Sequence, residues 1–342
     1  MRLRLILNKR KFKGNLSRDD DMKRVLLVIL ILAALAISGC TENQDKAEKS
    51  VEELKALSLS AAENLTSYSL KSTISNIRTL NDRGENATAE NATIIRESAE
   101  TEATVNLAGK QAHARGSTTI EVEHRLLERN TTTNEADLYQ MGNSTYIRDN
   151  GNWTHLQDPM TAEDIWKDGR NNQIKAMAET FNISLAELAG SESINGTDAY
   201  KLRIINGAAE SDALYETAFS MAANLVSYPM FMPSVNRTEL NETGRMEKTI
   251  WISKNTYIPV KYESKTSFKM TPIIVAGLDM NTSQMTMFNE SIELGTVEVS
   301  LESSDIYYDF DKPVTITPPT EALEAVVVRP VSIQPEDSLQ VE

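Results

Sequence analysis

The spacing of hydrophobic positions changes several times along the chain. From residue 50 to 65, apolar side chains recur every three or four positions, which predicts a helix. From residue 68 the period becomes two: Tyr68, Leu70 and Ile74 share one strand face with Ser72. The same alternation over residues 101–107 and 118–126 is typical of a half-buried antiparallel sheet.

Turn residues separate short strands between positions 139 and 156. Met141-Gly142-Asn143 and Asn150-Gly151-Asn152 have turn chemistry, which predicts a tight meander. Helical spacing returns at Thr161, and Ala199–Ile205 is expected to be a single strand.

Residues 210–226 predict a helix with an unusually wide apolar arc. One stripe is formed by Leu214, Ala218, Met221 and Leu225, and a second apolar stripe lies beside it. A helix with so wide an arc is mostly buried.

The last third of the chain predicts strands again. Residues 246–252 and 257–268 flank a polar turn and predict a hairpin. The alternation changes parity at Gly295, which suggests a bulge. Residues 321–342 are expected to form a mostly flexible acidic tail.

An apolar run of thirteen residues, 25–37, follows Lys23-Arg24. It ends three residues before the only cysteine, within the stretch Ile37-Ser38-Gly39-Cys40. This order is typical of a secretory signal, and the run is short for a membrane-spanning helix. The stretch resembles a lipobox, which implies cleavage before Cys40 and lipid attachment to its thiol. The alternative is a plain N-terminal anchor with an incidental cysteine. We expect residues 1–39 to be the signal-peptide region, with Met22 as the true start of the protein. Residues 40–49 are expected to be a lipidated tether.

The net charge excludes several partners. Residues 1–39 contain nine Lys/Arg and three Asp/Glu, so the remainder has 26 basic and 46 acidic residues, a net charge of −20. Such a surface repels nucleic acid and anionic membranes, so membrane attachment is expected through lipidated Cys40 on the extracytoplasmic face. With no disulfide available, a single domain over residues 50–320 needs a hydrophobic core, which this length can form.

Asn-x-Ser/Thr sequons are about three times as frequent after Cys40 as chance predicts, and they suggest an N-glycosylated surface protein. The alternative is that the excess of sequons arises only from Thr-rich strands that meet Asn-rich turns. A lipobox together with dense sequons favours an archaeal cell envelope. The twelve candidate glycosylation sites are Asn64, Asn86, Asn91, Asn130, Asn143, Asn152, Asn182, Asn195, Asn236, Asn241, Asn281 and Asn289, with Asn143 and Asn152 the best candidates.

The order of elements resembles the LolA/LppX-type superfamily of lipoprotein and lipid carriers. The resemblance covers about residues 50–320 and rests on the N-terminal helix with its strands, "GNSTYIRDNGNWT", "WISKNTYIPVKYES" and "YYDFDKPVTITPP". It implies an α+β fold, a strongly curved antiparallel sheet or incomplete β-barrel, with helices covering the concave side and an apolar cavity between them. The sequons, the acidic insert near residues 82–100 and the C-terminal tail depart from that family.

No catalytic constellation is found, so an enzyme is not expected, and neither is a cofactor. His113, His124 and His155 lack the spacing of a metal site. Asp305, Asp309 and Asp311 lack the ligand order of a calcium loop.

The stretch "YPMFMP" directly follows the broad apolar helix. Met230, Phe231 and Met232 either form the rim of an apolar cavity or complete the core. Two functions therefore remain open. The protein is a lipid-binding or lipid-carrying lipoprotein whose predicted cavity includes Leu214, Ala218, Met221, Leu225 and Met230 to Met232, or it is a structural or interaction glycoprotein with a filled core.

Overall fold

The computed structural model describes residues 49–81, 92–124, 127–149, 151–167, 171–205, 208–226, 230–279 and 284–328. All of them belong to one compact unit, Ala33–Glu342. The predicted signal peptide, Met22, Cys40 and most of the tether lie outside the described residues, as do Asn86, Asn91, Asn281 and the tail from residue 329.

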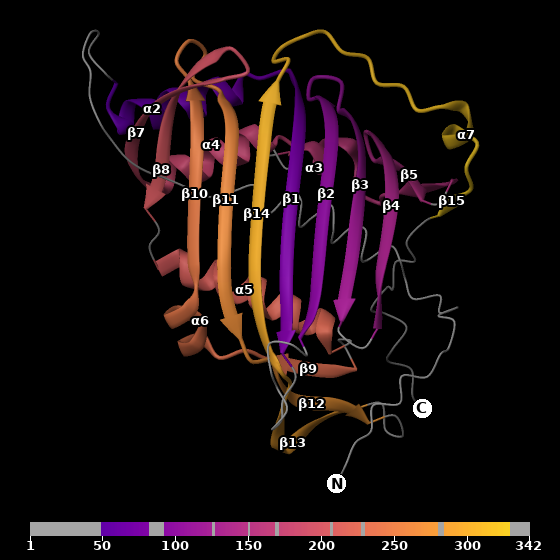
Figure 1. Cartoon of the computed structure of the whole chain (residues 1–342). Coiled ribbons are helices and arrows are strands. Elements are labelled where there is room, and N and C mark those ends of the chain that lie inside the picture. Colours follow the sequence, from indigo (N-terminus) through magenta and orange to yellow (C-terminus); the bar gives the residue numbers. More distant parts are fainter. Residues whose placement is uncertain are drawn as a thin grey trace, which may run out of the picture. The chain divides into compact units, whose positions relative to one another are not determined.

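The first half of the described chain forms one helix and a six-stranded meander (Figure 1). Helix α2 begins at a capping box, in which Ser50 accepts from the backbone N–H of Glu53 and the Glu53 carboxylate accepts from that of Ser50. The elements are α2 (Val51–Glu63), β1 (Ser67–Asn81), β2 (Thr93–Asn106), β3 (Gln111–His124), β4 (Leu127–Met141), β5 (Ser144–Asp149) and β6 (Asn152–Gln157).

The middle of the chain contains most of the helices. The region expected to be helical from Thr161 is two helices, and the single strand expected at 199–205 is the second strand of a hairpin whose first strand the pattern did not reveal. The elements are α3 (Ala162–Trp166), α4 (Gln173–Ile183), β7 (Leu185–Ile194), β8 (Thr197–Ile205), α5 (Ala208–Leu225), β9 (Phe231–Ser234) and α6 (Arg237–Thr243).

The last third is strand-rich, as predicted. The parity change at Gly295 is not a bulge but the junction between strands of two different sheets. Of the tail predicted for residues 321–342, the structure describes residues 321–328: Thr320–Leu323 form a helix and Val327–Val328 form a strand. The elements are β10 (Arg245–Ser253), β11 (Pro259–Met270), β12 (Ile273–Asp279), β13 (Gln284–Glu293), β14 (Thr296–Tyr308), α7 (Thr320–Leu323) and β15 (Val327–Val328).

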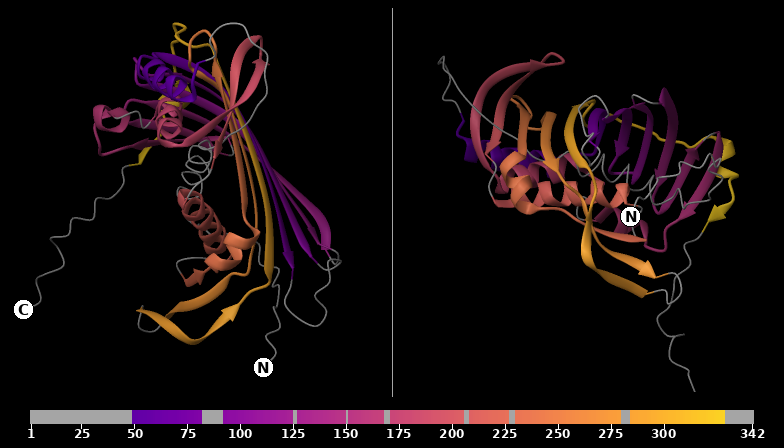
Figure 2. Two further views of the ribbon diagram at one scale, coloured as in Figure 1. Left: turned by 90° about the vertical axis from the view of Figure 1, so that its left-hand side faces the viewer. Right: turned by 60° about the horizontal axis from the view of Figure 1, so that its bottom comes forward.

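Twelve strands form one highly curved sheet that is not closed into a barrel. Their order is β15-β6-β5-β4-β3-β2-β1-β14-β11-β10-β8-β7, with antiparallel pairing throughout except between β15 and β6. The helices α2, α4, α5 and α6 lie on the concave side, here called the inner face (Figure 2). The predicted α+β fold, a curved and incompletely closed sheet with helices on its concave side, is therefore confirmed.

Candidate functional site

The helices on the inner face pack against two apolar clusters. The first joins α2 and α4 to strands β1, β8, β10, β11 and β14. It contains among its buried members Leu54, Phe181, Leu202, Ile250 and Tyr307.

The second cluster lies beneath α5 and α6. Four residues predicted to line a cavity are found here: Leu214 and Ala218 are fully buried, whereas Met221 and Leu225 are half-buried and pack against the cluster. Their buried partners include Val299 and Phe268. The first half of the α5 stripe therefore fills a packed core and does not border an open space.

Met230, Phe231 and Met232, the other three predicted cavity residues, are exposed. Phe231 and Met232 belong to β9, the edge strand of a separate three-stranded sheet with the order β13-β12-β9. Figure 1 shows this small sheet at the end of the large sheet where α5 and α6 lie.

Other apolar side chains of the small sheet are exposed as well. We use the name methionine surface for six residues that are between 38% and 68% exposed: Met230, Phe231, Met232, Met285, Met287 and Ile292. Met232 and Met287 are register partners of Ala276, so their side chains share one face of the small sheet. Met285 and Met287 were not predicted from the sequence, although their i, i+2 spacing in "QMTMF" was a usable strand signal.

Gly277 is needed where the small sheet is most crowded. A Cβ atom at this position would lie 2.8 Å from Cζ of Phe288 and 3.4 Å from Cδ1 of Phe231. The glycine therefore allows two aromatic rings to pack over the backbone of β12.

Between the two apolar clusters, the inner face carries a row of buried polar side chains, here called the polar belt. It crosses four neighbouring strands, β1, β14, β11 and β10. Register pairing places Ser72 opposite Asp305, and Ser264 opposite both Ser303 and Lys248. The belt consists of Ser72, Asn76, Lys248, Ser264, Thr266, Ser303 and Asp305.

Burial changes the acid–base properties of the belt. Desolvation raises the pKa of Asp305 to about 6, and a hydrogen bond from Ser72 partly opposes this shift. Burial also raises the pKa values of Tyr262 and Tyr307, and the neighbouring Asp305 charge adds to both shifts.

Several polar atoms at or beside the belt have no hydrogen-bond partner within the described structure. They include Oδ1 of Asn76, Oγ of Ser303 and the hydroxyl of Tyr307. Native interiors rarely leave such groups unpaired, so the belt is the most unusual feature of the inner face. The sequence pattern placed Ser72 on the apolar face of its strand. One polar residue on that face was not enough to predict the polar belt, which spans four strands.

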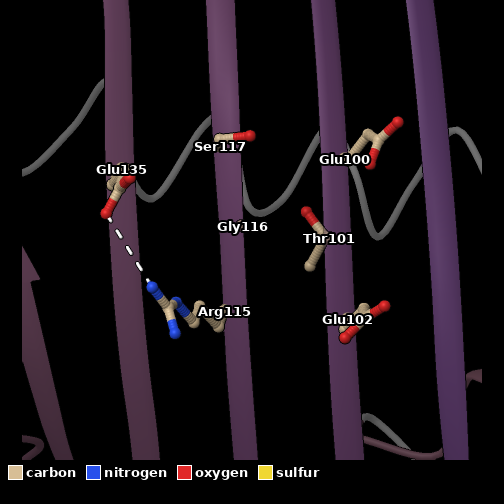
Figure 3. Close-up of a pocket in the computed structure, with 7 residues that line it drawn as sticks. All are labelled: Glu100, Thr101, Glu102, Arg115, Gly116, Ser117 and Glu135. Atoms are coloured by element: carbon tan, nitrogen blue, oxygen red, sulfur yellow. Dashed lines mark ion pairs between the residues drawn. The ribbon is translucent and has the colours of Figure 1, made fainter.

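The outer face has two shallow polar hollows. The hollow drawn in Figure 3 has a volume of about 220 Å³ and lies over β2, β3 and β4. Arg115 points toward Glu135, with 4.0 Å between the charged atoms. The remaining lining residues are Glu100, Thr101, Glu102, Gly116 and Ser117.

The second hollow, of about 230 Å³, lies between β2–β4 and the segment 314–317. His113 stacks on Tyr139 with 4.2 Å between the ring centroids, and its Nε2 lies 2.8 Å from Oδ1 of Asp137. Neither hollow includes any of the seven predicted cavity residues.

The three aspartates considered for a cation do not converge. Asp305 is buried on the inner face, Asp309 pairs with Lys312, and Asp311 accepts from the backbone N–H and hydroxyl of Thr66. Over the described ranges, no group of three or more His, Cys, Asp or Glu residues is arranged to hold a metal ion.

The described sequons differ in accessibility. Asn143, expected to be among the best glycan acceptors, is half-buried, and its Nδ2 donates to the carbonyl oxygens of Asp158 and Met160 at 3.2 Å each. Asn289 lies on β13. The exposed acceptors are Asn64, Asn130, Asn152, Asn182, Asn195, Asn236 and Asn241.

No family model matches the sequence, and no curated protein is significantly similar to it. Among solved structures, the chain is similar to a DUF1329 family protein from Desulfovibrio piger at 10% identity, over 79% of this chain and 96% of that one, with a TM-score of 0.21. So distant a likeness adds nothing to the fold described above. Within the part of the chain that the structure describes, no helix is long and apolar enough to cross a membrane.

Proposed function

We propose that the protein is an extracytoplasmic lipoprotein that binds or carries an apolar ligand of the lipid class and performs no catalysis. The ligand would contact the methionine surface and the adjoining half-buried face of α5. The LolA/LppX-type resemblance of the sequence is compatible with this function and is itself part of the proposal.

The observation that carries the proposal is the methionine surface. Six large apolar side chains are exposed on the small sheet and just before it, and three of them, Met232, Met285 and Met287, share one of its faces. Exposed apolar groups that gather in this way mark binding sites on soluble domains. Methionine is unbranched and polarisable, so a methionine-rich surface adapts to flexible hydrocarbon chains.

Position supports the same proposal. Strand β9 packs beside α5, so Phe231 and Met232 lie near the helix that bears Met221 and Leu225. A ligand held there would be shielded by α5 on one side and by the small sheet on the other. Removing apolar surface from water contributes about 25 cal/mol per Å².

Anchoring through Cys40 remains part of the proposal. Cys40→Ser should release the protein from membranes or leave an uncleaved precursor there. Unchanged cleavage together with unchanged membrane retention would contradict lipidation.

The alternative is a structural or interaction glycoprotein of the cell envelope. The packing of Leu214 and Ala218 in the second cluster favours it, because these two predicted cavity residues already fill a core. In that case the methionine surface would contact another protein and no lipid.

The proposal is tested by binding of N-phenyl-1-naphthylamine, an apolar dye whose fluorescence rises away from water. The delipidated full chain should bind it, and Met285→Ser with Met287→Ser should weaken binding at least about fivefold, as expected from the apolar area lost. A matched control is Ile183→Ser with Leu185→Ser, because these side chains are 85% and 68% exposed but lie outside the methionine surface. Equal loss in both double variants, or no dye binding by the wild type, would reject the proposal.

A further inference from the structure

The polar belt lies at three successive register levels of four adjacent strands, between the two apolar clusters of the inner face. Along β14 the inner-facing side chains run from Tyr307 through Asp305, Ser303 and the apolar Leu301 to Val299. Along β11 they run from Tyr262 through Ser264 and Thr266 to Phe268.

The two flanking strands repeat this order. Along β1, Leu70 of the first cluster is followed by Ser72 and Asn76, with the half-buried Ile74 between them, and then by Leu80 against the second cluster. Along β10, Lys248 lies between Ile250 of the first cluster and Met246, which packs against the second. A mainly polar layer, which also contains Ile74 and Leu301, therefore lies between two apolar layers of the inner face.

This arrangement is unfavourable unless the polar groups have partners. All seven belt residues are less than about one-tenth exposed, and Asp305 is only 3% exposed. A buried polar atom without a hydrogen bond destabilises the fold by the cost of its desolvation. Oδ1 of Asn76, Oγ of Ser303 and the Tyr307 hydroxyl are such atoms, so the belt can satisfy additional hydrogen bonds.

We propose that the polar belt binds the hydroxylated head group of a lipid, whose hydrocarbon chain lies along the adjoining apolar residues. This inference rests on the proposed function and specifies its ligand class.

The hydrogen-bond donors and acceptors of the belt indicate which kind of head group would fit. Oδ1 of Asn76 and the carboxylate of Asp305 only accept hydrogen bonds, whereas the hydroxyls of Ser303 and Tyr307 both donate and accept. A glycerol or sugar head group matches this set because each of its hydroxyls does both. A carboxylate head group would be repelled by ionised Asp305, and Lys248 already has an interaction within the protein.

Burial also predicts how binding proceeds. A head group reaches the belt only when elements packed on the inner face move apart. We therefore expect slow loading, and retention of the lipid once the elements close again.

The test compares two ligands of equal chain length, 1-monolauroylglycerol and dodecanoate, with the delipidated full chain at neutral pH. Calorimetry after long incubation should show at least about tenfold tighter binding of the monoglyceride, as one or two extra hydrogen bonds imply. Ser303→Ala should weaken monoglyceride binding about five- to tenfold and leave N-phenyl-1-naphthylamine binding unchanged.

Ser304→Ala is the matched control. Ser304 is the next residue of β14 and points to the outer face, so its loss should not alter either affinity. The variant Ser303→Ala loses a hydroxyl that has no partner, so it should fold, and circular dichroism checks this.

Each outcome has one meaning. If the dye binds but Ser303→Ala leaves monoglyceride affinity unchanged, the belt holds only buried water and the inference is overturned. If the wild type binds neither the dye nor the monoglyceride, the proposed function is rejected and this inference falls with it. Preference for dodecanoate over the monoglyceride would overturn the assigned head group while leaving apolar binding intact.

Discussion

Ser72 of β1 and Asp305 of β14 are direct register partners on the inner face, and the Ser72 side chain is hydrogen-bonded to the Asp305 carboxyl group. Both residues are buried. The hydrogen bond stabilises the carboxylate but does not cancel its desolvation, because the pKa of Asp305 rises from 3.8 to about 6. The native state therefore holds this proton more tightly than the unfolded chain does.

Asp305 should make the protein less stable as the pH rises from about 4 to 6. Below this window the carboxyl group is protonated in both states, and above it the native state bears the full cost of a buried charge. Asp305→Asn should therefore be more stable than the wild type at neutral pH, by up to about 3 kcal/mol, and similar to it near pH 4. Urea unfolding over this range measures the difference.

Asp309→Asn provides the control for this titration. Asp309 is exposed at the end of β14, where its positive φ is also tolerated by asparagine. Because the Asp309 carboxylate is exposed and pairs with Lys312, Asp309→Asn should not stabilise the protein at neutral pH. The same pH response in both variants would remove Asp305 as the cause.

Gly244 and Leu214 are predicted to be strongly coupled. A Cβ atom at Gly244 would overlap Cδ2 of Leu214 and lie 2.5 Å from the carbonyl oxygen of Leu240. Gly244→Ala should therefore destabilise the protein by about 1–3 kcal/mol, although its φ of −70° suits alanine.

A double-mutant cycle isolates this contact. Leu214→Ala alone should cost about 2–5 kcal/mol because Leu214 is buried in the second cluster. Part of the Gly244→Ala penalty should disappear in the Leu214→Ala background, since the overlapping methyl group is gone. If the two changes in the free energy of unfolding are strictly additive, the Gly244→Ala penalty comes only from the clash with the backbone carbonyl of Leu240.

Glycan occupancy should follow side-chain accessibility. Asn152 and Asn195 are exposed, and Asn195 lies with φ of 48° in the turn between β7 and β8. We expect glycans on both and little or none on Asn143, whose Nδ2 is engaged by two carbonyl oxygens. Glycopeptide mass spectrometry of the protein from its native host measures all three. High occupancy at Asn143 alone would contradict this order.

Local periodicity was sufficient to predict much of the fold. The two-residue alternation around Tyr68, Leu70 and Ile74 identified β1 and its inner face, because Tyr68 and Leu70 are buried in the first cluster. Strand β7 was missed because Leu185 points outward and is exposed, so its alternation carries no clear apolar face.

The candidate sites depended on contacts that sequence spacing does not encode. Leu214 and Met230 were assigned to one cavity from their proximity along the chain, yet the former is buried in a core and the latter is exposed. The polar belt arises from the register of β14, β11 and β10 with one another and with β1, which is distant from them in sequence. No single strand shows more than one or two misplaced polar residues.

Met221 provides the clearest distinction between a filled core and a ligand site. It is half-buried at the edge of the second cluster, whereas Leu214 is fully buried at its centre. Met221→Ala should therefore cost about 1–2 kcal/mol, clearly less than Leu214→Ala, because fewer contacts are lost and solvent can fill the space.

The same variant should also weaken binding of N-phenyl-1-naphthylamine. Met221 lies on α5, and β9 with Phe231 and Met232 packs beside this helix, so the dye would lose a contact there. We expect at least a threefold weaker affinity, of the order expected for losing part of one apolar side chain contact. A destabilisation equal to that of Leu214→Ala, with unchanged dye binding, would assign Met221 to the core and favour the glycoprotein with a filled interior.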